Sequence, residues 1–126
     1  MAFEFNKNGI CTNPNVFFRH ELDYCQHTKV STAQDPISGL WFAASSCSYK
    51  SAGSSSGVGR SSAWRVGYST EIKAAVACMM RVLTQHVETG NRHVVNSPQA
   101  VALLQRRVDE LTGKLGVQAD LFAMAA

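Results

Sequence analysis

The sequence predicts a small α+β protein, with an antiparallel sheet of about three strands, one packed helix, a second helix and a flexible C-terminal tail. Short segments that alternate apolar and polar side chains precede two segments with helical spacing. Turn residues separate these segments. The 126 residues, 45% of them hydrophobic and 17% charged, suffice for one globular domain with a modest core.

The chain divides into four parts. Residues 1–15 are rich in turn formers and predict an irregular lead-in. We expect an α+β domain over residues 16–96 and an amphipathic helix over residues 97–115. Residues 116–126 are then the tail.

The first predicted strand is VFFRHELDY, residues 16–24. Strict alternation places one set of side chains on one face, namely Phe18, His20, Leu22 and Tyr24. The other face then carries three charged residues and one aromatic residue, namely Phe17, Arg19, Glu21 and Asp23. Such a pattern is typical of a half-buried strand.

Two further strands are expected over residues 40–49, LWFAASSCSY, and 63–68, AWRVGY. Residues 26–39 carry turn chemistry at Asp35-Pro36 and Ser38-Gly39, so we expect them to form a connection. The Gly/Ser-rich residues 51–62 are expected to form the mobile tip of a hairpin.

The first helix is predicted to start after Ser69 and Thr70, which are candidate N-caps, and to end at Gly90. Glu71 in its first turn suits the helix dipole. Its apolar residues lie at helical spacing and would cover one side of the sheet: Ile72, Val76, Met79, Met80, Leu83 and Val87.

The second helix is predicted over residues 98–114, with Ser97 as N-cap and Pro98 at the first helical position. A seam in steps of three and four residues runs through Val101, Leu104, Val108, Leu111 and Leu115. Because fewer than three heptads are present, we expect packing on the domain and not an independent coiled coil. Self-association through this helix is the alternative.

The formal net charge of +3 permits contact with nucleic acid without requiring it. Basic residues around the Gly/Ser segment are the candidate DNA contacts: Lys50, Arg60, Arg65 and Lys73. Trp41 and Trp64 would supply stacking surfaces. The alternative is that these charges are solvated and that the tryptophans belong to the core.

We expect neither an enzyme nor a cofactor or metal site. GSSSGVGR lacks the Gly-Lys-Ser/Thr of a phosphate-binding loop, and Cys25 with His27 fits no standard zinc spacing. No histidine–acid pairing for nucleophilic catalysis is recognisable. Because the N-terminus has no secretory pattern and no apolar run is long enough to span a membrane, the four cysteines are expected to be buried thiols in a reducing cytoplasm.

Residues 118–122, QADLF, carry the clearest functional motif. They closely resemble the peptide by which bacterial proteins dock on the sliding clamp of DNA replication, the DNA polymerase III beta subunit. That pattern is a glutamine, two variable residues, a leucine or methionine, and a phenylalanine or leucine. The matching residues are Gln118, Asp120, Leu121 and Phe122.

The resemblance implies that Leu121 and Phe122 enter a hydrophobic cleft of the clamp, while Gln118 fixes the register and Asp120 meets the polar rim. Physical chemistry agrees, because full burial of such side chains is worth about 1.5–3 kcal/mol each. A foreign cleft would explain why two of them stand together on a tail.

The remaining layout loosely resembles small accessory proteins encoded on phages and plasmids. We therefore expect a cytoplasmic accessory or inhibitor protein that competes with other clients of the bacterial sliding clamp. One alternative is a nucleic-acid-binding module. Another is an inhibitor of a different host complex, such as an anti-defence protein of the anti-CRISPR kind.

Overall fold

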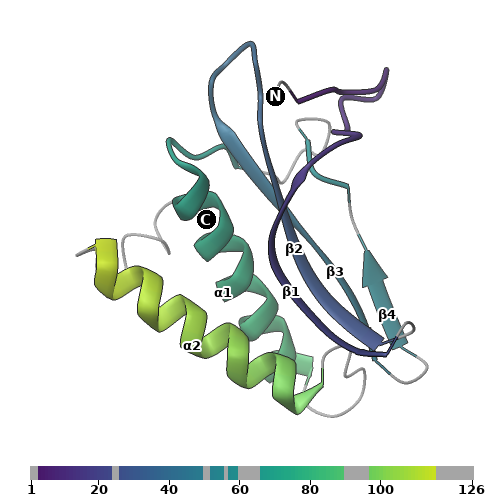
Figure 1. The fold of residues 1–126 in the computed structure, drawn as a ribbon, viewed down its shortest axis with the longest axis vertical. Coiled ribbons are helices and arrows are strands. Elements are labelled where there is room, and N and C mark those ends of the chain that lie inside the picture. The colour runs from purple at the N-terminus through teal and green to yellow at the C-terminus, as the bar shows by residue number, and fades with distance from the viewer. Residues whose placement is uncertain are drawn as a thin grey trace.

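The computed structural model describes residues 3–23, 26–49, 52–55, 57–59, 66–89 and 97–115. In chain order the elements are β1 (Asn15–Asp23), β2 (Gln26–Gln34), β3 (Trp41–Tyr49), β4 (Ala52–Ser55), α1 (Glu71–Thr89) and α2 (Pro98–Leu115). The strands form one antiparallel sheet in the order β1-β2-β3-β4, and both helices lie on the same side of it (Figure 1). The expected α+β class is confirmed.

Strand β2 corrects the prediction that residues 26–39 are only a connection. It pairs with β1 on one side and β3 on the other, so it is central in the three long strands. Thr28 and Thr32 on β2 are 1% and 0% exposed. Because threonine is β-branched and readily hydrogen-bonded, a polar-looking segment can occupy the middle of a sheet.

The predicted turn residues do form the turn that joins β2 to β3. The Asp35 N–H donates to the Leu40 carbonyl and the Gly39 N–H donates to the Asp35 carbonyl, both at 2.8 Å. The Asp35 carboxylate also accepts the Ser38 hydroxyl at 2.9 Å. Gly39 has φ of 75°, a left-handed conformation that favours glycine.

The structure differs from the prediction that residues 63–68 form the third strand. Residues 63–65 lie outside the described part of the chain, and Tyr68 forms an isolated bridge with Trp41. The fourth strand is instead β4, inside the segment that was expected to be a mobile loop. β4 pairs with residues 46–49 of β3.

A β-bulge in β1 changes the predicted faces of that strand. The register shifts between Val16 and Phe18, which leaves Phe17 as the extra residue. Phe17 and Phe18 consequently both pack against the core under the helices. Strict alternation therefore assigned Phe17 to the wrong face.

Helix α1 lies between the sheet and α2, and this position explains its unusually wide buried surface. Residues 74–79 are all buried, with Val76 and Met79 at 0% exposure. At its start, the Glu71 carboxylate accepts hydrogen bonds from the Thr32 hydroxyl at 2.7 Å and the Asn15 amide at 3.0 Å. These two bonds join the first turn of α1 to β2 and β1.

Helix α2 completes the same core, as expected from its seam. The Ser97 hydroxyl caps it by accepting the Ala100 N–H at 3.1 Å. Leu104, Val108 and Leu111 are buried in the cluster that contains Met79 and Val30. The seam therefore packs on the domain, and self-association through α2 would have to use another face of the helix.

A second, smaller core lies on the side of the sheet away from the helices. Phe3, Phe5 and Cys11 of the N-terminal segment, together with Val58, pack over Ala33, Phe42 and Ala44. Gly59 pairs with Ile10, and a Cβ on Gly59 would lie 2.0 Å from the Gly9 carbonyl oxygen, so only glycine fits there. This lid covers the half of the sheet nearest the β2–β3 turn.

We predict that Leu104→Ala lowers the free energy of unfolding by about 2–5 kcal/mol, because it leaves a cavity in the core. Leu103, the preceding residue in α2, is 38% exposed and is the matched control. Leu103→Ala should cost less than about 1 kcal/mol. Urea denaturation followed by circular dichroism compares the two, and equal losses would show that α2 is not packed as described.

Candidate functional site

The residues of the clamp-like motif, Gln118, Asp120, Leu121 and Phe122, lie outside the described part of the chain. The structure instead describes the helix from which the motif extends. α2 ends at Leu115, so Gln118 follows three residues later.

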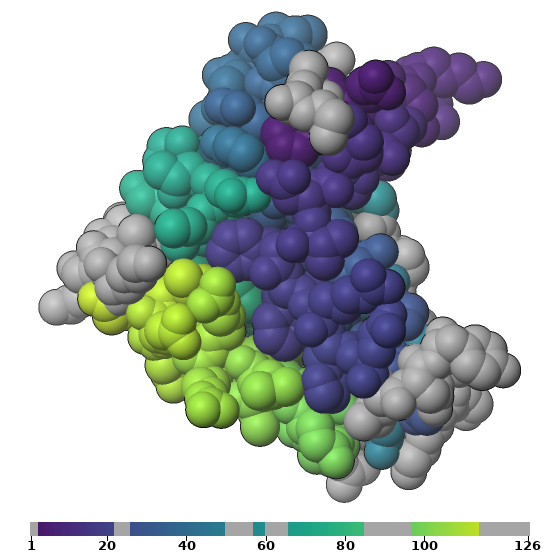
Figure 2. Space-filling view, in the orientation of Figure 1, coloured from purple at the N-terminus to yellow at the C-terminus, as the bar shows by residue number. Residues whose placement is uncertain are grey.

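Helix α2 is attached to both the core and β1. Besides its buried leucines, the Arg107 guanidinium lies 5.8 Å from the centre of the Phe17 ring of β1. Arg107 also pairs with Glu110 at 2.9 Å. In the space-filling view α2 and β1 lie side by side, so the helix is held to the edge of the sheet as well as to α1 (Figure 2).

Of the four basic residues predicted to contact DNA, Lys73 alone lies within the described segments; Lys50, Arg60 and Arg65 do not. The Lys73 side chain lies at the first turn of α1, with Nζ 3.4 Å from the Ser69 hydroxyl. It therefore belongs to the helix side of the molecule.

Trp41, one of the predicted stacking residues, has a structural role. It packs against the cluster of Tyr68, Ala74 and Ala77, and its ring makes an edge contact with Phe3 at 5.7 Å. This supports the alternative that the tryptophan belongs to the core. Trp64 lies outside the described residues.

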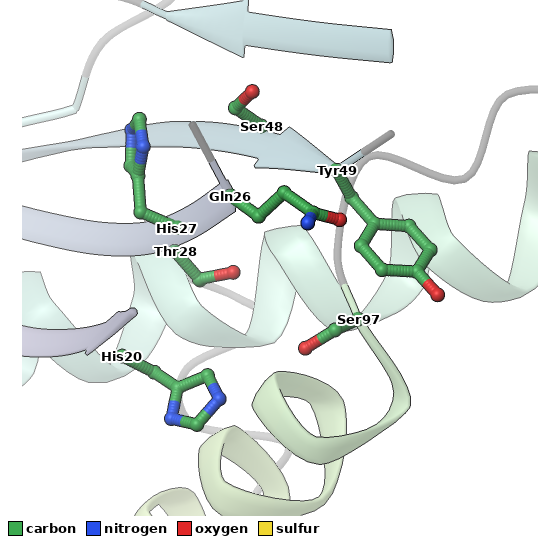
Figure 3. A pocket seen from close by; sticks show the side chains of 7 residues that line it. All are labelled: His20, Gln26, His27, Thr28, Ser48, Tyr49 and Ser97. Carbon is green, nitrogen blue, oxygen red and sulfur yellow. The ribbon is translucent and has the colours of Figure 1, made fainter. Parts of the chain in front are cut away.

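A small polar hollow lies where β1, β2 and β3 meet the N-terminus of α2 (Figure 3). Its lining side chains are His20, Gln26, His27, Thr28, Ser48, Tyr49 and Ser97. The His20 Nε2 atom is buried and has no hydrogen-bond partner among the described residues. The space between these side chains does not admit a water molecule, so the hollow is a polar packing site and not a ligand cavity.

Figure 3 also shows that the end of the sheet has two unlike sides, because His27 and Ser48 project away from Thr28 and Ser97. The register explains this: His27 is opposite Ser48, and the neighbouring Thr28 is opposite Cys47. On the side away from the helices, the pairing gathers a set that we call the polar face: Arg19, Glu21, His27, Lys29, Ser46 and Ser48.

The polar face was not recognisable from the sequence. Its four β1 and β2 members all carry a charge or an imidazole, but they lie in one segment predicted to be a strand and in another predicted to be a turn region. Only the pairing of β1 with β2 sets Arg19 opposite Lys29 and Glu21 opposite His27. A signal was present in the alternation of His27, Lys29 and Ser31 with Thr28 and Val30, but threonine obscured it.

The described part of the chain contains no cluster of three or more histidine, cysteine or acidic side chains that is arranged to hold a metal ion. Cys11, Cys47 and Cys78 are buried free thiols, as expected, whereas Cys25 lies outside the described residues. Neither α1 nor α2, the two helices that the structure describes, combines the length and hydropathy of a membrane span.

Burial also affects one phenol in the core. Tyr68 is 7% exposed, and desolvation raises its pKa above the usual value of 10.0. The positive charge of Arg81 partly opposes this shift. The phenol is thus kept neutral between the sheet and α1.

Comparison of the chain with protein-family models, with curated proteins and with solved structures finds no match.

We predict an alkaline loss of stability that depends on Tyr68. Its folded-state pKa is raised, so its contribution is complete below pH 10 and is lost as the pH rises through the folded value. Tyr68→Phe should therefore reduce the fall in urea midpoint above pH 10. An identical alkaline slope in wild type and Tyr68→Phe would contradict the assignment.

Proposed function

We propose that this chain binds the bacterial sliding clamp, the DNA polymerase III beta subunit, through residues 118–122. The observation that carries the proposal is the match of Gln118, Asp120, Leu121 and Phe122 to the docking pattern. Leu121 and Phe122 are the anchors, Gln118 sets the register, and Asp120 contacts the polar rim.

The described fold supports this proposal through the helix that precedes the motif in the sequence. Leu104 and Leu111, at 0% and 4% exposure, lock α2 into the core. The motif begins only three residues after that helix, which gives a short tether on a rigid support. A short linear motif that becomes ordered on binding has a modest affinity, with a few anchor residues supplying most of the free energy.

The mechanism that follows is competition. A small chain that occupies the cleft excludes every other protein that needs the same cleft, without any chemical step. This is the mode of action of an accessory or inhibitor protein, such as one encoded by a phage or plasmid, acting in the bacterial cytoplasm. The buried free thiols of Cys11, Cys47 and Cys78 fit a reducing compartment.

We predict that the full chain binds purified clamp and that Leu121→Ala with Phe122→Ala weakens binding by about 100-fold or more. Loss of two anchors worth about 1.5–3 kcal/mol each accounts for that factor. Isothermal titration calorimetry gives the dissociation constants. Binding of the wild-type chain should also displace a fluorescent client peptide from the clamp.

The matched control is Met124→Ala, which shortens another apolar side chain of the same tail outside the motif. It should bind as wild type does. The proposal is overturned if wild-type chain does not bind the clamp, or if the double variant binds it equally well.

A further inference from the structure

We propose that the polar face of the sheet binds single-stranded nucleic acid through its phosphates. This surface differs from the tail motif and from the basic residues that the sequence suggested. It is formed by three neighbouring strands, on the side of the sheet opposite the helices.

Two cations lie opposite each other on β1 and β2. Arg19 on β1 is directly opposite Lys29 on β2, so their side chains leave the sheet on the same side. Directly opposed residues have Cβ atoms about 4.5–5.5 Å apart, and like charges in that position destabilise the strand pair. An anion bound between them would remove this repulsion.

Within the polar face, the two cations Arg19 and Lys29 are offset by one carboxylate, that of Glu21. Arg19 contacts Glu21 at 2.7 Å, but their side chains are 60% and 47% exposed. Such a surface pair is worth about 0–1 kcal/mol, so a phosphate can replace the carboxylate at little cost. The half-buried Lys29 side chain makes no ion pair or hydrogen bond with the residues that the structure describes.

The neighbouring strand β3 adds hydroxyl groups to this surface. Ser46 and Ser48 of β3 lie opposite Lys29 and His27, so short hydroxyl side chains flank the cations. The His27 Nε2 atom lies 3.0 Å from the Ser46 hydroxyl, and this contact orients the imidazole ring beside β3. Hydroxyls donate to phosphate oxygens, and an imidazole ring can stack on an unpaired base.

These features favour a single strand over other anionic partners. The short Ser46 and Ser48 side chains leave space for an extended single strand of nucleic acid to lie along the sheet. A duplex is a convex cylinder and would touch less of this surface. An acidic protein could pair with the cations, but it would bring no unpaired base to contact the His27 ring. The apolar lid of Phe3, Phe5 and Val58 on the other half of this side confines the contact to the polar face.

The test measures binding of the full chain to a fluorescent oligothymidine of about 20 nucleotides by anisotropy, at salt concentrations from about 50 to 200 mM. Arg19→Gln with Lys29→Gln should weaken binding at low salt. The slope of log affinity against log salt should become shallower by about 1.4, that is about 0.7 for each lost phosphate contact.

The matched control is Arg81→Gln with Arg106→Gln, which removes the same net charge from exposed positions on α1 and α2. This control should keep the wild-type slope, and thermal denaturation checks that both double variants are folded. Equal losses in both double variants, an unchanged slope in the polar-face variant, or tighter binding of a duplex or of polyglutamate would overturn the proposal.

The outcome is separable from that of the clamp experiment. The Arg19 and Lys29 substitutions should leave clamp affinity unchanged, and the Leu121 and Phe122 substitutions should leave oligothymidine affinity unchanged. Failure of one proposal therefore leaves the other measurable in the same protein.

Discussion

The packing of α2 against α1 and the sheet is the constraint on which the rest of the molecule depends. Leu104, Val108 and Leu111 meet Met79 and Val30 in one cluster, which encloses α1 between α2 and the strands. Without that contact, the apolar side chains of α1 that face α2 would be exposed to water. The same contact fixes α2, the last element of the chain that the structure describes.

The central strand β2 gives the sheet its two unlike sides. Thr28, Val30 and Thr32 point into the helix-covered core, while His27 and Lys29 point to the opposite side. That opposite side is itself divided, because the N-terminal segment covers its apolar half. The polar half is thus placed away from α2, which puts the proposed nucleic-acid surface and the origin of the tail on different layers (Figure 1).

The helices were predictable because their signals are local. Ser97 and Pro98 mark the start of α2, and the helical spacing after Thr70 marks α1. Strand β2 was missed because its buried threonines look polar in the sequence and only pairing partners reveal their burial. Phe17 was misplaced because a bulge depends on the neighbouring strand. For the same reason the polar face could not be predicted, whereas the tail motif was recognised by resemblance alone.

Amide hydrogen exchange of the full chain, with and without purified clamp, shows whether residues 118–122 are the segment that binds. We expect fast exchange at residues 118–122 in the free chain and marked protection of the same residues in the complex, with little change in α1, α2 or the sheet. Strong protection of Phe122 in the free chain would contradict this expectation, because the side chain would then belong to the chain's own core. Protection confined to the folded domain on adding clamp would contradict it equally.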